Sequence, residues 1–319
     1  MNSEKDFKTL RYIKLGAGGS QAKYCLENGR IRFGFWTCEM LPECKSGDWE
    51  AVESRLKEER AKQNGGRAPR SVANDLRQIR DFFEDQGETV WVTFSNRKMF
   101  WGRTNGPAYA VENGEDRWTE KKMSVDGWRD VDTKGKALRV DDLSGHLTMV
   151  GSYRGTICSF GPVERQEYLV RRLLGEDSEI FETTSNLVAQ LHEKIASMIK
   201  HLHSFDFEIL VEAIFVNTGW TRLGRAGKDE ELIDFLMART AVNGKREDVA
   251  IQVKASTNQD EFKRYENSLV ETYSDALFVY HSGNVSASAD TKVRLLDATS
   301  LAPLVVEAGL LQWLLERVR

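Results

Sequence analysis

The sequence has no apolar run of about 18 residues, the length that a membrane-spanning helix needs. Residues 1–6 also lack the apolar core of a secretory signal peptide. These two absences predict a cytoplasmic protein without a membrane segment.

Cysteine is scarce as well, with 4 residues in the chain, and no two of them have CxxC spacing. We therefore expect reduced thiols that form neither a disulfide framework nor a zinc site. The four are Cys25, Cys38, Cys44 and Cys158.

The remaining composition is that of an ordinary soluble protein, 40% hydrophobic and 29% charged. A length of 319 residues predicts about two domains. The formal net charge is −4, and residues 161–319 are the acidic part, with 18 Lys and Arg against 25 Asp and Glu. An acidic second half suits both a nuclease, whose carboxylates bind a metal ion, and plain solvated helices.

Short alternating segments in the first half predict strands, and two segments with apolar residues at helical spacing predict helices. The strands are expected at 30–36, 89–94 and 99–102, and the helices at 48–62 and 71–83. Ser71 is suited to cap the second of these helices. Short strands with two early helices predict a small α+β barrel.

The pattern becomes helical after Gly161-Pro162, which marks a domain boundary. We expect a recognition domain at 1–162, a helical connector at 163–200 and a second domain at 201–319.

The sharpest chemical pattern lies in the second domain. A helix predicted at 205–216 carries Glu208 and Glu212 at positions i and i+4, so both lie on one side. Taken alone, this pair is typical of a solvated acidic stripe, and the segments that follow give it another meaning.

Two strands follow that helix. The strand at 232–237 carries Asp234 among large apolar residues. The strand at 249–253 holds Gln252 and is followed by Lys254, and the side chains of these two residues lie on the same face because they are two positions apart. Burying a carboxylate costs several kcal/mol unless it is paired or binds a metal. The pattern therefore predicts either a structural salt bridge or a hydrolytic site.

A hydrolytic site has a clear chemical basis here. Mg²⁺ prefers oxygen ligands such as carboxylates, amide oxygens and water, and it activates a bound water molecule. Gln252 offers a neutral oxygen, and Lys254 can hold the attacking water or stabilise charge on the phosphate.

At these residues the sequence resembles the Mrr-like branch of the PD-(D/E)xK nuclease superfamily. The resemblance rests on Phe207-Glu208-Ile209-Leu210-Val211, then Gly219-Trp220, an acidic strand and Gln252-Val253-Lys254. It implies an α/β restriction-endonuclease-like domain with a central mixed sheet flanked by helices. It also implies a site of Glu208, a strand acid, Gln252 and Lys254, with Mg²⁺ as cofactor, for which Mn²⁺ can substitute.

The strand acid is where the sequence departs from that family. The family shows a short D-x-x-I-D or D-I-D-L segment, whereas this chain has Asp229-Glu230-Glu231-Leu232-Ile233-Asp234. Asp234 is the closer local match and Glu231 is the alternative. We expect the metal ligands to be Asp234 or Glu231 together with Gln252.

Basic residues near the site in sequence, among them Arg222 and Lys228, are candidates for contacts with DNA phosphates. Exposed charge that only keeps the protein soluble explains each of them equally well.

The first domain resembles the EVE/PUA-like group of small barrels. The resemblance rests on the order in which three segments follow one another, namely Asp48-Trp49, the helix with Leu76 to Phe83, and Val90-Trp91-Val92-Thr93-Phe94. The resemblance implies recognition of a modified base, stacked on aromatic side chains. The aromatic candidates are Trp36, Trp91, Trp101 and Tyr109, each of which also suits a core role. Arg67 and Arg70, in a basic loop, are candidates to follow the DNA backbone.

Together these observations predict a Mg²⁺-dependent DNA endonuclease of the restriction type, acting on modified or foreign double-stranded DNA in phage defence. Cleaving both strands requires two sites, so a homodimer is expected, with helix 302–318 as its interface. The alternatives are an inactive nucleic-acid-binding protein, an RNA-directed protein, and a protein whose charges at 229–254 are ordinary salt bridges.

Overall fold

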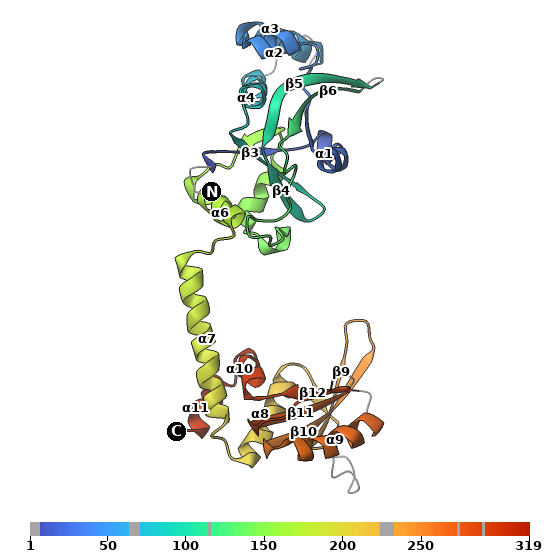
Figure 1. The fold of residues 1–319 in the computed structure, drawn as a ribbon, viewed down its shortest axis with the longest axis vertical. Helices are drawn as coiled ribbons and strands as arrows, with labels where there is room; N and C mark the ends of the chain where they lie inside the picture. The colour runs from blue at the N-terminus through green and yellow to red at the C-terminus, as the bar shows by residue number, and fades with distance from the viewer. Residues whose placement is uncertain (1–6, 64–70, 114–115, 224–232, 273–274, 289–290) are drawn as a thin grey trace. The chain divides into compact units, whose positions relative to one another are not determined.

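The computed structural model describes residues 7–63, 71–113, 116–223, 233–272, 275–288 and 291–319. The chain divides into two compact units, Met1–Ser178 and Glu179–Arg319. Figure 1 shows strands and helices in both. Among the described residues, none of the helices combines the length and the apolarity needed to cross a bilayer.

The first unit contains two sheets, of strand order β4-β3-β1-β7 and β2-β6-β5. Their strands are β1 (Thr9–Ile13), β2 (Arg30–Phe33), β3 (Thr89–Ser95), β4 (Lys98–Gly102), β5 (Thr104–Asn113), β6 (Asp116–Met123) and β7 (Ile157–Ser159). The main helices are α1 (Ala22–Asn28), α2 (Leu41–Ser46), α3 (Trp49–Gln63), α4 (Val72–Phe83), α5 (Gly145–Thr148) and α6 (Val163–Leu174). The predicted α+β class is confirmed, whereas closure into a barrel stays a prediction.

Two local expectations for this unit need correction. Ser71 does precede α4, but its side chain makes no capping hydrogen bond. Strand β2 ends at Phe33 instead of reaching Trp36, because Phe35 and Trp36 adopt left-handed backbone conformations, with φ of 59° and 56°. A strand cannot continue through such residues.

A buried charged pair links the two sheets of this unit. Lys121 on β6 is 1% exposed, and its ammonium lies 3.6 Å from the carboxylate of Asp85 and donates to the Asp85 carbonyl at 2.6 Å. The carboxylate also accepts from the Trp91 indole N–H on β3 and the Thr104 hydroxyl on β5. Burial opposes ionisation of Asp85, but the bond from Thr104 and the charge of Lys121 lower its pKa below the usual value.

The second unit is built on one five-stranded mixed sheet of order β12-β11-β10-β9-β8. Its strands are β8 (Thr221–Arg222), β9 (Phe235–Thr240), β10 (Arg246–Thr257), β11 (Ala276–Gly283) and β12 (Val293–Leu296). The helices are α7 (Glu179–Ile199), α8 (Ser204–Asn217), α9 (Gln259–Thr272), α10 (Ala298–Glu307) and α11 (Leu311–Arg317). Strand β10 runs antiparallel to β9 and parallel to β11, with α9 in the connection between β10 and β11.

Side-chain alternation along β10 divides the core of this unit in two. Val249, Ile251 and Val253 join a cluster with residues of α7, α8, α10 and α11. Ala250 lies on the opposite face, in a cluster with Phe262 of α9. Both faces of the sheet are therefore covered by helices, as the resemblance implied.

The predicted helix 302–318 is wrong as a single element. The segment forms α10 and α11, separated by a turn in which Gly309 has φ of 70°. Leu301, Val305 and Leu314 are fully buried, so both helices pack into the core of the unit.

The Asp85–Lys121 pair yields a stability prediction. Replacing Asp85→Ala leaves a buried ammonium without its counterion, and we expect unfolding to become easier by about 3–5 kcal/mol. Urea unfolding followed by tryptophan fluorescence measures this, since six of the 8 tryptophans lie in the first unit.

Asp130→Ala is the matched control, because Asp130 pairs with Lys98 in an exposed ion pair of 2.6 Å. Such pairs contribute about 0–1 kcal/mol. Equal effects of the two substitutions would contradict a special role for the buried pair.

Candidate active site

Asp234 stands immediately before β9 and is fixed against β10. Its backbone N–H donates to the carbonyl of Ile251 at 2.9 Å, which extends the β9–β10 pairing by one residue. Its carboxylate Oδ2 accepts two hydrogen bonds of 2.7 Å, from the Gln252 side chain and from the backbone N–H of Val253. The carboxylate is therefore held at the edge where the two strands meet.

Gln252 is the buried member of the site, with 2% of its surface exposed. Its Nε2 donates to Asp234, while its Oε1 is buried and has no hydrogen-bond partner among the described residues. Buried polar atoms nearly always have a partner. An amide oxygen of this kind, in a side chain that contacts a carboxylate, is suited to a cation or to a hydrogen-bond donor.

Lys254 follows two residues along β10, on the same sheet face as Gln252. Its ammonium lies 5.1 Å from the centre of the Tyr265 ring. Partial burial opposes the charged form, but the Tyr265 hydroxyl, followed by the charges of Asp234 and Glu261, raises the pKa of Lys254 above its usual value. The lysine is therefore a cation at neutral pH.

Tyr265 and Glu261 belong to α9 and were not among the residues predicted for the site. The available signal was the spacing of Phe262 and Tyr265, which puts two aromatic rings on one face of a helix. A helix that connects two parallel strands packs its apolar face on the sheet, so the spacing indicates that both rings contact the sheet, whereas the residues that they meet depend on how the helix crosses it.

Glu208 lies on α8, which packs against the opposite face of the sheet. It is half-buried and follows Phe207, whose ring contacts His281 of β11 at 4.6 Å. Asp234, Gln252 and Lys254 thus come together on one face, whereas Glu208 belongs to a helix on the other side of the sheet. Its place in the site stays a prediction.

Arg222, a candidate for phosphate contacts, has partners within the protein. It forms an ion pair of 2.7 Å with Glu212 of α8, and its guanidinium lies 4.8 Å from the centre of the Phe235 ring. Glu231 and Lys228, as well as Arg67 and Arg70 in the first unit, lie outside the described residues.

The donor set fits a hard cation. Among the described residues, no group of three or more His, Cys, Asp or Glu side chains is arranged to bind a metal ion. Asp234 nevertheless places a carboxylate in contact with the amide group of Gln252, whose oxygen has no partner among the described residues. Mg²⁺ is commonly bound by one or two protein oxygens and retains several waters, so two adjacent donors meet its needs.

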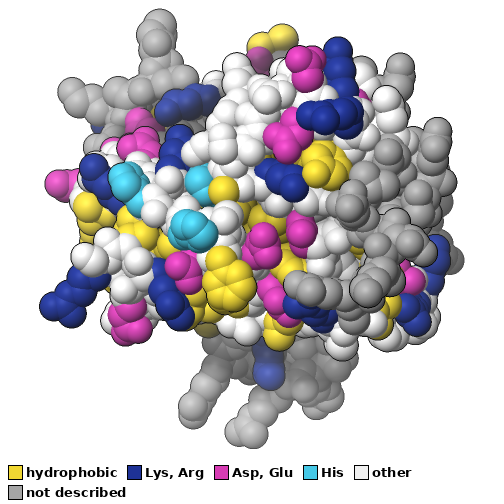
Figure 2. All heavy atoms as spheres, turned by 90° about the horizontal axis from the view of Figure 1, so that it is seen from below, with side chains coloured by type: hydrophobic (Ala, Val, Ile, Leu, Met, Phe, Trp, Pro, Cys, Tyr) yellow, Lys and Arg dark blue, Asp and Glu magenta, His cyan; other side chains and the backbone are white. Residues whose placement is uncertain are grey.

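The surface of this unit offers no strong electrostatic preference on the face drawn in Figure 2. Lys and Arg side chains alternate there with Asp and Glu, and histidine and apolar side chains lie between them. A broad basic patch is absent from the described residues on this face. Binding of a polyanion here would depend on individual contacts.

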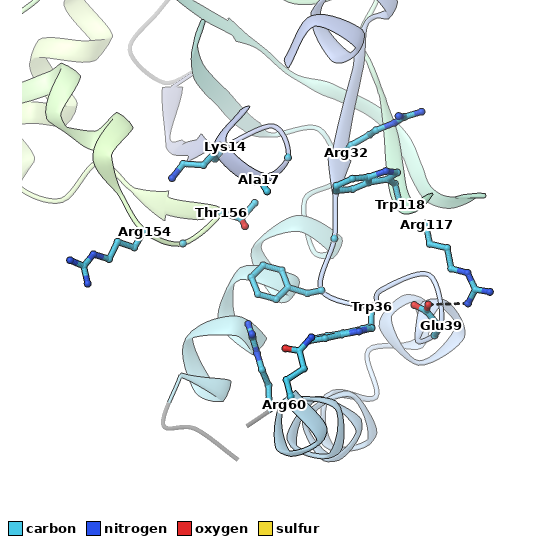
Figure 3. A pocket seen from close by; sticks show the side chains of 16 residues that line it. Lys14, Ala17, Arg32, Trp36, Glu39, Arg60, Arg117, Trp118, Arg154 and Thr156 are labelled. Atoms are coloured by element: carbon cyan, nitrogen blue, oxygen red, sulfur yellow. Dashed lines mark hydrogen bonds and ion pairs between the residues drawn. The ribbon is translucent and has the colours of Figure 1, made fainter. Parts of the chain in front are cut away.

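The aromatic candidates of the first unit have different environments. Trp91 is fully buried and donates its indole N–H to Asp85, so its assignment to base stacking is corrected to a core role. Trp101 is 5% exposed and donates to the Val131 carbonyl. The Tyr109 hydroxyl bonds to Glu120. Trp36 alone of the four lines the cavity of about 750 Å³ shown in Figure 3.

Comparison with known proteins adds little. No protein-family model and no curated protein matches the chain. A solved structure of the MspJI restriction endonuclease in complex with a 27-mer oligonucleotide is similar at 12% sequence identity, with 78% of this chain and 69% of that chain covered. The TM-score is 0.24, a level that does not establish a shared fold.

The geometry around Lys254 predicts a measurable titration shift. In the Tyr265→Phe variant we expect the Lys254 pKa to fall, because the hydroxyl that stabilises the ammonium is removed. Titration of isotopically dimethylated lysines by NMR follows this directly.

Tyr280→Phe is the control, because Tyr280 of β11 is the register partner of Lys254, yet its hydroxyl is not among the causes of the lysine's raised pKa. A Lys254 resonance that titrates identically in the wild type and in Tyr265→Phe would contradict the assignment.

Proposed function

We propose that the second unit is a Mg²⁺-dependent phosphodiesterase that cuts DNA. One observation carries the proposal. The Asp234 carboxylate accepts a hydrogen bond from the amide nitrogen of Gln252, the buried oxygen of the same amide has no partner among the described residues, and Lys254 stays charged on the same sheet face. A structural salt bridge explains the carboxylate and the lysine, but it gives the Gln252 oxygen no function.

In this proposal the residues have separate roles. Asp234 and Gln252 hold the ion through a carboxylate and an amide oxygen. The chemistry that Mg²⁺ supplies when bound is polarisation of the scissile phosphate and activation of a water molecule. Lys254 orients the attacking water and stabilises the negative charge that develops on the phosphate. Glu208, and Glu231 as the alternative strand acid, are further candidates to assist.

The proposed substrate is double-stranded DNA of modified or foreign origin, with the first unit choosing the DNA and the second cutting it. Restriction requires cleavage of both strands, and one site of this kind cuts one strand at a time. We therefore propose a working homodimer. Mn²⁺ is expected to substitute for Mg²⁺, because it accepts the same oxygen ligands.

The test is cleavage of matched modified and unmodified duplexes by the purified full chain with Mg²⁺ or Mn²⁺. We expect Lys254→Ala to lower the cleavage rate by about 10²–10³-fold, the effect of removing a positioned electrostatic group. Chelation of the metal should abolish cleavage in the wild type.

Lys292→Ala is the matched control, since Lys292 is exposed and not part of the site. The catalytic proposal is contradicted if the wild type cuts neither duplex, or if the Lys254→Ala variant cuts at the wild-type rate. Titration with Mn²⁺ then identifies an inactive domain, which binds no metal through Asp234, and competition with RNA tests whether DNA is the substrate.

A further inference from the structure

The first unit contains a cavity of about 750 Å³ that the nuclease proposal does not use. Its walls come from the glycine turn at 16–18, the segment after β2, the end of α3, strand β6 and the segment before β7. Figure 3 shows Trp36, Trp118 and Glu39 on one side and Lys14 and Arg154 on the other. A volume of this size accommodates a ligand of the size of a nucleotide.

Two consecutive aromatic residues in the wall have an unfavourable backbone. Phe35 and Trp36 have φ of 59° and 56°, a region that non-glycine residues rarely adopt. Each such residue costs about 1–3 kcal/mol, and strain of this kind gathers at ligand-binding sites. The strained turn directs two rings toward the cavity, where a flat ligand can stack.

A fixed guanidinium supports these rings. Arg60 of α3 lies 5.4 Å from the centre of the Trp36 ring and 5.5 Å from that of Phe35. It is held by an ion pair of 2.6 Å with Asp75, which is 4% exposed. The aromatic wall is therefore rigid before any ligand arrives, and rigidity reduces the entropy lost on binding.

The cavity has an excess of positive charge. Five of its lining residues are Lys or Arg and one is acidic. Arg32, Arg60 and Arg117 pair with carboxylates. Lys14 donates to the Tyr153 carbonyl, and Arg154 is exposed; neither pairs with a carboxylate among the described residues. These two are suited to an anionic group such as a phosphate.

Two polar atoms in lining residues lack partners. The indole N–H of Trp118 and the Oε2 of Glu39 are buried and make no hydrogen bond among the described residues. One is a donor and the other an acceptor. A nucleobase edge carries both donors and acceptors, so it offers a partner to each kind of group.

We propose that this cavity binds a single nucleotide. Its base stacks against Phe35 and Trp36 and presents its edge to Trp118 and Glu39, and its phosphate meets Lys14 and Arg154. The inference deepens the role that the proposed function gives to the first unit in choosing DNA, and it rests on the proposed function in that respect. It is separable from the cleavage site, because every residue involved belongs to the first unit. The nucleotide is either free or part of a nucleic-acid strand.

Calorimetric titration of the full chain tests this. The probes are the four common deoxynucleoside 5′-monophosphates, 5-methyl-deoxycytidine monophosphate, a single-stranded 12-mer and inorganic phosphate. Binding of the monophosphates assigns the site to free nucleotides, and binding of the 12-mer alone assigns it to a strand. We expect Trp36→Gly to weaken binding about five- to 150-fold, the range for loss of one stacked base.

Trp36→Gly is informative because glycine adopts the left-handed conformation without strain, so the turn is retained when the ring is lost. Glu39→Gln is a second variant that keeps the side-chain shape and should weaken binding by altering the base edge contact. Arg154→Ala should weaken binding of every nucleotide, whereas Arg139→Ala, an exposed arginine elsewhere in the unit, should not.

Lys254→Ala separates this inference from the nuclease proposal, because it should leave nucleotide binding unchanged. The inference is overturned if no nucleotide or 12-mer binds, or if inorganic phosphate binds as tightly as the nucleotides. It is equally overturned if Trp36→Gly and Glu39→Gln both bind every probe with the wild-type affinity.

Discussion

The side-chain alternation of β10 is the constraint on which the second unit depends. The strand is hydrogen-bonded on both sides, so its residues have only two directions to face. Val249, Ile251 and Val253 must enter the larger core, and this fixes Gln252 and Lys254 on the other face. A shift of one residue would bury the lysine in that core and turn the valines toward the face covered by α9. Packing energy thus sets the position of the side chains of the candidate site.

The same strand also restrains the carboxylate opposite it. Asp234 is fixed by its own N–H, which pairs with Ile251, and by two donors from Gln252 and Val253. These bonds offset part of the desolvation of a half-buried carboxylate. Because Gln252 uses its nitrogen for this purpose, its oxygen is left for another partner. Asp234 and Gln252 are therefore coupled, because a substitution of either residue changes the oxygen atoms that are available to a ligand.

The sequence allowed prediction of the parts of the site that follow from regular periodicity. The position of Gln252 and Lys254 on one strand face and the apolar face of α8 could be inferred, because side-chain directions repeat every two residues in a strand and about every 3.6 residues in a helix. Tyr265 was missed because its meeting with Lys254 depends on how α9 crosses the sheet. Trp91 was misassigned because five successive residues of β3 are buried, so alternation identifies no exposed face there. Nothing in the sequence indicated that Phe35 and Trp36 would be left-handed.

The candidate site of the second unit was easier to predict from the sequence than the cavity of the first unit, and this has a physical reason. A site of the proposed kind requires its oxygen ligands and its lysine to be fixed to within about 0.5 Å, and paired strands provide such accuracy from regular geometry. A slot for a flat ring requires a sharp change of chain direction, which at Phe35 and Trp36 is reached through a strained turn held by the packing around it. Regular elements can be inferred from their repeat, whereas a strained turn depends on many distant contacts. The cavity therefore becomes visible only in three dimensions, although each of its aromatic and basic residues stands plainly in the sequence.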